Sequence, residues 1–259
     1  MSSENQVNSK HKIAIVTGGS RGIGRNTVEA LASRGIDVIF TYRANQAEAE
    51  AAAAAVEAHG AKAVAIQLDT GRIADFDAFV GKVKEALQAL NADRFDYLVN
   101  NAGNSYHAPI SETTEEAFDE LVNVHFKGIY FLTQKLLPLI NDGGRIINIS
   151  SGLARFTVPG ISAYASVKGA IEVFTRYLAK ELGPRGITAN TVAPGAVQTD
   201  FSGGIVRDNP VYNKMVSDQT ALGRPGLAED LGPMIASLLS AENRWVNGQR
   251  IEVSGGIHA

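Results

Sequence analysis

The stretch Thr17-Gly-Gly-Ser-Arg-Gly-Ile-Gly24 joins a short β-branched run to a segment whose apolar residues recur with helical spacing. Glycine suits positions where the backbone turns tightly or approaches another group closely. We expect Gly18 to make the turn, Gly22 to let a pyrophosphate approach the backbone, and Gly24 to let the helix pack on the strand. A helix that begins here presents free N–H groups and a partial positive charge to an anion. The stretch therefore predicts a unit that binds dinucleotide phosphates, although glycines alone also suit an ordinary tight turn.

The same alternation of strand-like and helix-like segments continues to the end of the chain. Strands separated by helices imply right-handed crossovers and a parallel sheet that is covered on both faces. We therefore predict an α/β fold built on a Rossmann-like, doubly wound parallel sheet of about seven strands. The predicted strands span residues 12–17, 37–42, 62–68, 97–100, 145–149, 188–193 and 249–253, and the predicted helices span residues 22–34, 46–59, 73–90, 114–139, 162–182 and 228–239.

The domain organisation predicted from the sequence is simple. Residues 1–11 are polar and lack the apolar centre of a signal peptide, so we expect a flexible, solvated tail. Residues 12–259 contain no linker-like stretch and are expected to form a single Rossmann-fold domain. Glycine and proline gather between Pro194 and Arg224, which predicts a long irregular segment. A loop of this length is usually functional, and we expect a substrate lid around residues 196–224.

Composition and charge exclude several classes of protein. The 24 basic and 27 acidic residues give a net charge of −3, which offers no footprint for nucleic acid or an anionic membrane. The chain has no cysteine, which excludes disulfides and thiolate nucleophiles and is compatible with a reducing cytoplasm, the predicted location. No apolar run is long enough to span a bilayer. Five scattered histidines form no ligand cluster, so we expect no metal.

Three residues form the candidate catalytic group. Ser151 follows the predicted strand 145–149 at its carboxyl end, where open α/β sheets bind their ligands. Tyr164 and Lys168 are four residues apart on the next predicted helix and therefore share one face. A phenol titrates near about pH 10, but a neighbouring ammonium stabilises the phenolate and lowers the phenol pKa. The group predicts a tyrosine general acid and base, although Tyr-x-x-x-Lys alone also describes an ordinary amphipathic pair.

Together these motifs resemble the short-chain dehydrogenase/reductase family, in its single-domain, ketoreductase-like branch. The resemblance rests on the glycine turn, on the thirteen-residue step from Ser151 to Tyr164-Ala-Ser-Val-Lys168, and on the ending Gly248–Gly256. It implies an NAD(P)-binding domain and an oxidoreductase that interconverts a ketone or aldehyde and an alcohol by hydride transfer. In that family the tyrosine exchanges the proton, the serine orients the substrate oxygen, and the lysine also binds the nicotinamide ribose.

Two other functions are compatible with this fold. A non-catalytic dinucleotide-binding regulator would share the glycine turn, but would have no need of Ser151, Tyr164 and Lys168. A structural or interaction module would use the long helices, but the same three residues would then have no purpose.

The end of the second predicted strand favours NADP(H) as the cofactor, with NAD(H) as the alternative. A carboxylate there would bind the ribose 2′-hydroxyl of NAD, but the strand ends Phe40-Thr-Tyr-Arg43 without one. Arg43 and Arg21 suit a 2′-phosphate, because guanidinium binds phosphate through paired hydrogen bonds. The alternative role for Arg43 is to solvate the end of the strand.

The resemblance implies further cofactor contacts along the chain. Asp69 is expected at the adenine, although its carboxylate also suits a turn or a helix cap. Asn101 is expected near the adenine ribose, Val197 near the nicotinamide carboxamide, and Thr199 near the carboxamide or the phosphate. The predicted cofactor-binding residues are Gly18, Ser20, Arg21, Gly22, Ile23, Gly24, Tyr42, Arg43, Asp69, Thr70, Asn101, Ala102, Gly103, Tyr164, Lys168, Pro194, Gly195, Val197 and Thr199.

One position departs from the family pattern. The family has Asn-x-x-Gly in the helix of this region, and the asparagine supports a water that links the lysine to solvent. Here the stretch reads Asn123-Val-His-Phe-Lys-Gly128, so His125 occupies the matching position. Asn123 lies about 200° away around a regular α-helix. Histidine relays protons near neutral pH, so either His125 is the fourth catalytic residue or a shift of register makes Asn123 the functional one.

The substrate is a small-molecule carbonyl or alcohol that the motifs do not specify further. The loops at residues 104–111 and 152–160 are expected to line its pocket, with His107, Arg155 and Phe156 as candidate contacts or solvent-facing residues. Family members usually assemble as tetramers, so a homotetramer formed through the long helices is expected. No nucleic-acid or membrane partner is predicted.

Overall fold

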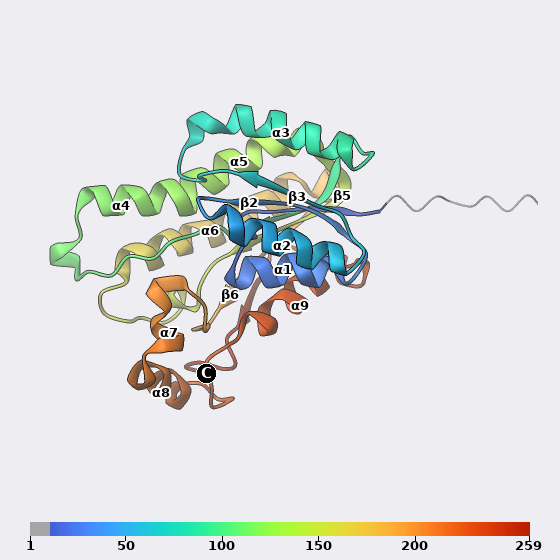
Figure 1. Ribbon diagram of the computed structural model, residues 1–259. Helices are drawn as coiled ribbons and strands as arrows, with labels where there is room; N and C mark the ends of the chain where they lie inside the picture. The colour runs from blue at the N-terminus through green and yellow to red at the C-terminus, as the bar shows by residue number, and fades with distance from the viewer. Residues whose placement is uncertain (1–10) are drawn as a thin grey trace, which may run out of the picture.

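The computed structural model describes residues 11–259, so the predicted tail at residues 1–11 lies almost wholly outside it. Seven parallel strands form one sheet in the order β3-β2-β1-β4-β5-β6-β7 (Figure 1). The predicted α/β fold with a doubly wound parallel sheet is thereby confirmed. β5 begins earlier than predicted, at Ile140, because Ile140 pairs with Phe95 of β4. The strands are β1 (Ile13–Val16), β2 (Asp37–Tyr42), β3 (Ala63–Gln67), β4 (Phe95–Asn100), β5 (Ile140–Ile149), β6 (Thr188–Pro194) and β7 (Arg250–Val253).

Helices cover both faces of the sheet, because successive strand residues point to opposite sides. Ala14 and Val16 of β1 pack with α1, α2 and α9, whereas Ile13 and Ile15 pack with α3, α5 and α6. The layers are visible in Figure 1, where α3 and α5 lie above the sheet and α1, α2 and α9 below it. The helices are α1 (Gly22–Ala32), α2 (Gln46–Ala58), α3 (Phe76–Ala89), α4 (Glu115–Val122), α5 (Gly128–Leu136), α6 (Ser162–Glu181), α7 (Ile205–Asp208), α8 (Pro210–Gln219) and α9 (Ala228–Leu238).

The long helix predicted at residues 114–139 is not a regular α-helix. A π-helical turn, Asn123–Lys127, joins α4 to α5, and within it the Gly128 N–H bonds to the carbonyl five residues back. Gly128 also lies directly against the loop after β3, since a Cβ there would overlap the Thr70 carbonyl oxygen. The pattern of apolar residues predicted a helix here, but it does not distinguish α from π geometry.

The segment predicted to be irregular, residues 194–224, contains two helices, α7 and α8. They form a lobe that stands apart from the sheet in Figure 1. α8 starts with two strong signals: Asn209 Oδ1 accepts hydrogen bonds from the Val211 and Tyr212 N–H groups, and Pro210 occupies the first turn. The expectation of a loop without regular structure was therefore wrong for this half of the segment.

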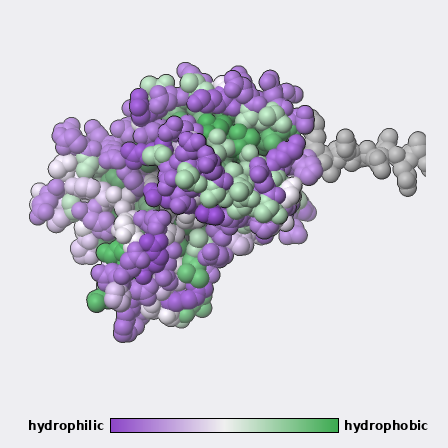
Figure 2. Space-filling model, viewed as in Figure 1, coloured by the Kyte–Doolittle hydropathy of each residue, from purple (hydrophilic) through white to green (hydrophobic). Residues whose placement is uncertain are grey.

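One face of the surface is shown in Figure 2. In the view of Figure 2 it is mostly hydrophilic, with apolar areas over the edge strand β3 and the alanine-rich helix α2. The aromatic side chains of Tyr130 on α5 and Tyr177 on α6 are 40% and 63% exposed. In residues 11–259, no helix combines the length and the apolar character needed to cross a membrane.

Candidate active site

The turn after β1 depends on backbone contacts that only glycine permits. Gly18 and Gly22 adopt the left-handed conformation, with φ angles of +66° and +56°. A Cβ at Gly24 would overlap the Gly18 carbonyl oxygen, so α1 starts directly against the end of β1. The three predicted glycine positions thus form one compact turn between strand and helix.

The loop after β4 braces this turn. Thr17 Oγ1 accepts hydrogen bonds from the Asn101 and Ala102 N–H groups, at 2.9 and 3.0 Å. The Asn101 amide donates to the carbonyls of Thr17 and Gly18, at 2.9 and 3.1 Å. The side-chain amide of Asn101 therefore donates two hydrogen bonds to main-chain carbonyls. Thr17 joins the two loops but was not among the predicted site residues, although it stands immediately before the glycine turn.

The amino terminus of α1 is open to an anion. Arg21, the N-cap residue, is extended and its side chain caps nothing, so the first N–H groups of the helix have no capping acceptor. Thr199, from the loop after β6, packs against Gly22, where its Cγ2 is 3.4 Å from an ideal Cβ. A hollow of about 400 Å³ lies beside them, between α1, the start of the lid and the start of α9, and its lining includes the carboxylates of Glu29, Asp200 and Glu229. The uncapped first turn of α1, rather than this hollow, fits a pyrophosphate bound at a helix amino terminus.

The predicted adenosine contacts lie at the ends of β2 and β3. Tyr42 ends β2, and the Arg43 side chain that follows is 67% exposed. Arg43 Nε lies 3.4 Å from Asp69 Oδ2, a pairing that the sequence did not indicate. Asp69 Oδ1 accepts a hydrogen bond from the Gly71 N–H at 2.9 Å, so this carboxylate also stabilises the turn after β3.

The segment after β6 reaches across the carboxyl edge of the sheet. Pro194 pairs with Val253 of β7, and the Gly195 N–H donates to the Val253 carbonyl at 3.1 Å. Val197 forms a bridge with Gly226, which ties the start of the lid to its end. Of the remaining predicted contacts, Ser20 and Thr70 are buried, Ile23 and Ala102 are half-buried, and Gly103 is exposed. All the predicted cofactor residues outside α6 thus follow strands at one edge of the sheet.

Ser151, Tyr164 and Lys168 come together where β5 ends beside α6. All three are largely buried, with exposed fractions of 9%, 7% and 3%. Lys168 Nζ donates to the Ile149 carbonyl at 2.8 Å and lies 5.6 Å from the centre of the Tyr164 ring. Ser151 Oγ accepts a hydrogen bond from the Leu153 N–H at 3.2 Å, which leaves the hydroxyl proton for another acceptor.

Burial governs the protonation of this group. It raises the pKa of Tyr164 above its ordinary value, and the neighbouring Ser151 hydroxyl opposes the rise. Burial lowers the pKa of Lys168 to about 7. The lowering of the Tyr164 pKa that the sequence led us to expect is therefore absent in the protein alone. Near neutral pH, Lys168 exists in both the charged and the neutral form.

His125 is completely buried beside the same group. Its ring centre lies 5.3 Å from that of Tyr164, with the rings nearly perpendicular. Nε2 lies 2.8 Å from the Asn104 carbonyl oxygen, whereas Nδ1 is buried without a partner in the part of the chain that the structure describes. Burial, and next the charge of Lys168, hold the pKa of His125 well below its ordinary value. Of the two candidates, His125 rather than Asn123 is the one placed against the tyrosine.

Gly103 makes room for this imidazole. A Cβ at Gly103 would stand 2.6 Å from His125 Cε1, so the loop after β4 fits closely over the ring. The same loop braces the glycine turn through Asn101. His125 is thus linked by packing to the predicted phosphate end of the site.

Phe201, in the lid, makes an aromatic contact with Tyr164. Its ring centre lies 6.1 Å from that of Tyr164, and its side chain is 42% exposed. Phe201 lies in the segment predicted to form the lid, residues 196–224, and was not among the predicted site residues. It stands immediately before Ser202, which adopts the left-handed conformation with a φ angle of +55°.

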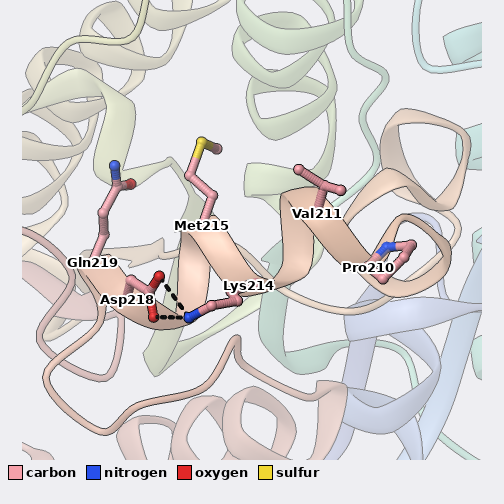
Figure 3. A pocket seen from close by; sticks show the side chains of 6 residues that line it. All are labelled: Pro210, Val211, Lys214, Met215, Asp218 and Gln219. Carbon is pink, nitrogen blue, oxygen red and sulfur yellow. Dashed lines mark hydrogen bonds and ion pairs between the residues drawn. The ribbon is translucent and has the colours of Figure 1, made fainter.

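A separate hollow of about 490 Å³ lies on α8 in the lid (Figure 3). Val211 and Met215 point to one side of the helix, and Lys214 pairs with Asp218 at 2.8 Å on another. None of the predicted cofactor or catalytic residues lines it, so it does not mark the site. Its lining residues are Pro210, Val211, Lys214, Met215, Asp218 and Gln219.

The chain is similar to known proteins over nearly its whole length. A family model described as enoyl-(acyl carrier protein) reductase matches residues 18–258. A hydroxynaphthalene reductase of Aspergillus fumigatus is 34% identical over 248 residues, which cover 92% of this chain and 89% of that protein. A short-chain dehydrogenase of Burkholderia cenocepacia, solved in complex with NADP, is 35% identical with a TM-score of 0.88 and covers 97% of this chain and 100% of its own. A promiscuous reductase that catalyses keto-reduction at C1 during lugdunomycin biosynthesis is 37% identical with a TM-score of 0.91, over 96% and 98% of the two chains.

The lowered pKa of Lys168 predicts how stability depends on pH. The pKa of Lys168 is about 7 in the folded protein and about 10.4 in the unfolded chain. Between these two pH values the unfolded chain binds one more proton than the folded protein. The free energy of unfolding should therefore gain up to about 1.4 kcal/mol per pH unit from this group as the pH rises above about 7. Lys168→Met should remove that gain.

Urea unfolding without added nucleotide, followed by circular dichroism between about pH 7 and about pH 9, measures this slope. Lys180→Met is the matched control, because Lys180 lies exposed on the same helix and should leave the slope as in the wild type. Equal slopes in the wild type and in Lys168→Met would show that the folded lysine titrates normally.

Proposed function

The chain belongs to the short-chain dehydrogenase/reductase family of NAD(P)-dependent oxidoreductases, and on that premise we propose that it reduces a ketone or aldehyde with NADPH, or oxidises the alcohol with NADP⁺. The observation that carries this proposal is that Ser151, Tyr164 and Lys168 lie together at the carboxyl edge of the sheet. The uncapped amino terminus of α1 lies at the same edge. A hydroxylic proton donor and a phosphate cradle then share one site. The activities for which two of these relatives are named, hydroxynaphthalene reduction and keto-reduction, support a ketone as the substrate.

The end of β2 supports NADP(H) over NAD(H). Positions 42 and 43 carry no carboxylate, and within residues 11–259 the exposed Arg43 guanidinium is held only by the 3.4 Å pairing with Asp69. A 2′-phosphate would offer Arg43 a doubly charged, bidentate acceptor in place of that contact. Asp69 would keep its hydrogen bond to the Gly71 N–H and with it the turn. The relative from Burkholderia cenocepacia was solved with NADP bound, which agrees with this preference.

The residues of the catalytic group divide the proton chemistry between them. When bound, the cofactor supplies the hydride and, in its oxidised form, a positive charge that favours the phenolate. Tyr164 donates its hydroxyl proton to the carbonyl oxygen as the alkoxide develops, and takes a proton back in the reverse direction. Ser151 donates a hydrogen bond to the same oxygen and orients it. Lys168, whose pKa is about 7, then donates a proton from its ammonium group to the Tyr164 phenolate.

His125 takes the fourth position in this proposal. Its low pKa keeps the imidazole neutral, so it adds no second positive charge beside Lys168. Its perpendicular packing against the Tyr164 ring limits how that ring can turn. The buried and unpartnered Nδ1 is suited to a water that carries protons to the site.

The alternatives to an enzyme are disfavoured by the same group. A regulator needs the phosphate cradle but gains nothing from a buried lysine beside a buried tyrosine. The single-domain organisation, the homotetramer and the cytoplasmic location stay predictions.

Tyr164→Phe should abolish turnover and spare cofactor binding. Loss of the proton donor is expected to lower kcat by at least about 100-fold, because the hydroxyl is the only group removed. The assay is NADPH oxidation with a panel of ketones and aldehydes that includes 1-tetralone, combined with a fluorescence titration of NADPH. Tyr177→Phe, an exposed tyrosine on the same helix, is the control. Activity retained in Tyr164→Phe, or a wild type that binds NADPH but reduces no carbonyl, would sink the assignment.

Arg43→Ala should weaken the binding of NADPH and leave the binding of NADH unchanged. Loss of the charge-assisted contact is expected to raise the Kd of NADPH about tenfold or more. Arg34→Ala, just after the carboxyl end of α1, is the control for loss of a surface charge. Titrations of both nucleotides into the wild type and both variants measure the effect. Tighter binding of NADH than of NADPH by the wild type would refute the cofactor assignment.

Variants of His125 and Asn123 should show which one the rate depends on. His125→Ala is expected to lower kcat about tenfold or more, and His125→Asn to restore part of it, because an amide can also bind a water at this position. Asn123→Ala should stay within about twofold of the wild type. A loss confined to Asn123→Ala would assign the role to Asn123 instead.

A further inference from the structure

Four charged side chains form one network behind Ser151. Arg250 on β7 donates to Glu172 Oε1 on α6 at 2.7 Å and to Glu252 Oε2 at 2.9 Å. Arg155 holds Glu252 through two hydrogen bonds, at 2.7 and 2.8 Å. Two positive and two negative groups balance, and the side chains of Glu172, Glu252 and Arg250 are only 14%, 19% and 23% exposed. Pairs this sheltered from water interact more strongly than exposed ion pairs.

The network bonds to the Ser151 carbonyl and to the side chain of the preceding residue, Ser150. Arg250 Nη2 donates to the Ser151 carbonyl at 3.3 Å. Ser150 Oγ donates to Glu172 Oε1 at 2.8 Å and lies 3.2 Å from the Lys168 carbonyl. Because Glu172 and Lys168 are one turn apart on α6, these bonds fix the end of β5 against the helix that carries the tyrosine and the lysine.

Arg250 bonds to the chain just beyond the last hydrogen bonds between β5 and β6. The last register pair between β5 and β6 is Ile149 with Val192, and the Ser150 N–H still donates to the Val192 carbonyl at 2.8 Å. The Ser151 carbonyl lies beyond this ladder, where it accepts hydrogen bonds from the Ala154 N–H at 3.2 Å and from the Arg250 guanidinium at 3.3 Å. The planar guanidinium contacts Glu172, Glu252 and Ser151 through three different nitrogens in a rigid fork, whereas the ammonium of a lysine presents its donors from one nitrogen on a flexible stem.

We propose that Arg250 and Glu172 are positioning residues for carbonyl reduction, which set the direction of the Ser151 hydroxyl relative to Tyr164. The inference rests on the proposed role of Ser151. Neither residue touches the substrate or the cofactor in this proposal. Their effect is on orientation, so their loss should lower kcat and leave the Kd of NADPH unchanged.

The test compares Arg250→Met with Arg185→Met. Arg185 has the same kind of environment far from the site, an ion pair with Asp142 and hydrogen bonds to the Leu137 and Ile140 carbonyls. Both variants lose one such set of contacts, but only Arg250→Met should lower kcat, by about tenfold. The readouts are kcat and KM for the ketone of the panel that the wild type reduces fastest, the Kd of NADPH, and the melting temperature. Equal kcat in the two variants would overturn the proposal.

Arg250→Lys covers the case in which Arg250→Met does not fold. It keeps the positive charge between the two glutamates but loses the fork that reaches Ser151. We expect a melting temperature near that of the wild type together with a lowered kcat. Wild-type kcat in Arg250→Lys, with the Met variant unfolded, would show that the residue supports only the fold.

A double-mutant cycle separates this inference from the proposed function. If Arg250 acts through Ser151, adding Arg250→Met to Ser151→Ala should change kcat by less than about twofold. A full additional loss would mean that Arg250 acts by another route, and would overturn the positioning role. Wild-type kcat in Ser151→Ala alone would instead refute the proposed role of the serine.

Discussion

The candidate site depends on one steric constraint, the contact between the start of α1 and the end of β1. Gly24 has no room for a side chain against the Gly18 carbonyl, so the helix can take only one position relative to the strand. Asn101 lies against the same point and bonds to the turn, which fixes the loop after β4. Gly103 of that loop packs on His125 beside the tyrosine. The two ends of the site, for phosphate and for proton transfer, are therefore coupled through a few close contacts.

A chain of buried polar side chains fixes α6 on the other face of the sheet. The Asn100 amide donates to Asn148 Oδ1 at 2.8 Å, the Asn148 amide donates to Thr175 Oγ1 at 2.9 Å, and Thr191 Oγ1 donates to Thr175 Oγ1 at 2.9 Å. Apolar packing alone would let a helix slide along a parallel sheet, whereas these directional bonds are satisfied at one register only. This register brings the face of α6 that carries Tyr164 to the end of β5.

Sequence patterns predicted the fold and the main candidate group, because both depend on short-range spacing. Parallel strands end at one edge, so residues that follow strands gather there, and Tyr164 with Lys168 needs only the pitch of a helix. The start of α8 was visible in Asn209-Pro210 and was overlooked. The raised pKa of Tyr164 could not be predicted from the sequence, since it arises from burial in the tertiary structure. So was the contact of Arg250 with Ser151, which joins residues 99 positions apart.

The π-helical turn at Asn123–Lys127 also bears on which changes of chain length the protein can absorb. The turn holds one residue more than an α-helical turn, so deleting one residue there would give a regular helix through α4 and α5. Everything on α4 would then rotate by about 100° relative to α5. His125 would leave the tyrosine while both helices survived. A deletion at this turn would thus change the site from outside it, whereas a surface loop tolerates a change of the same length.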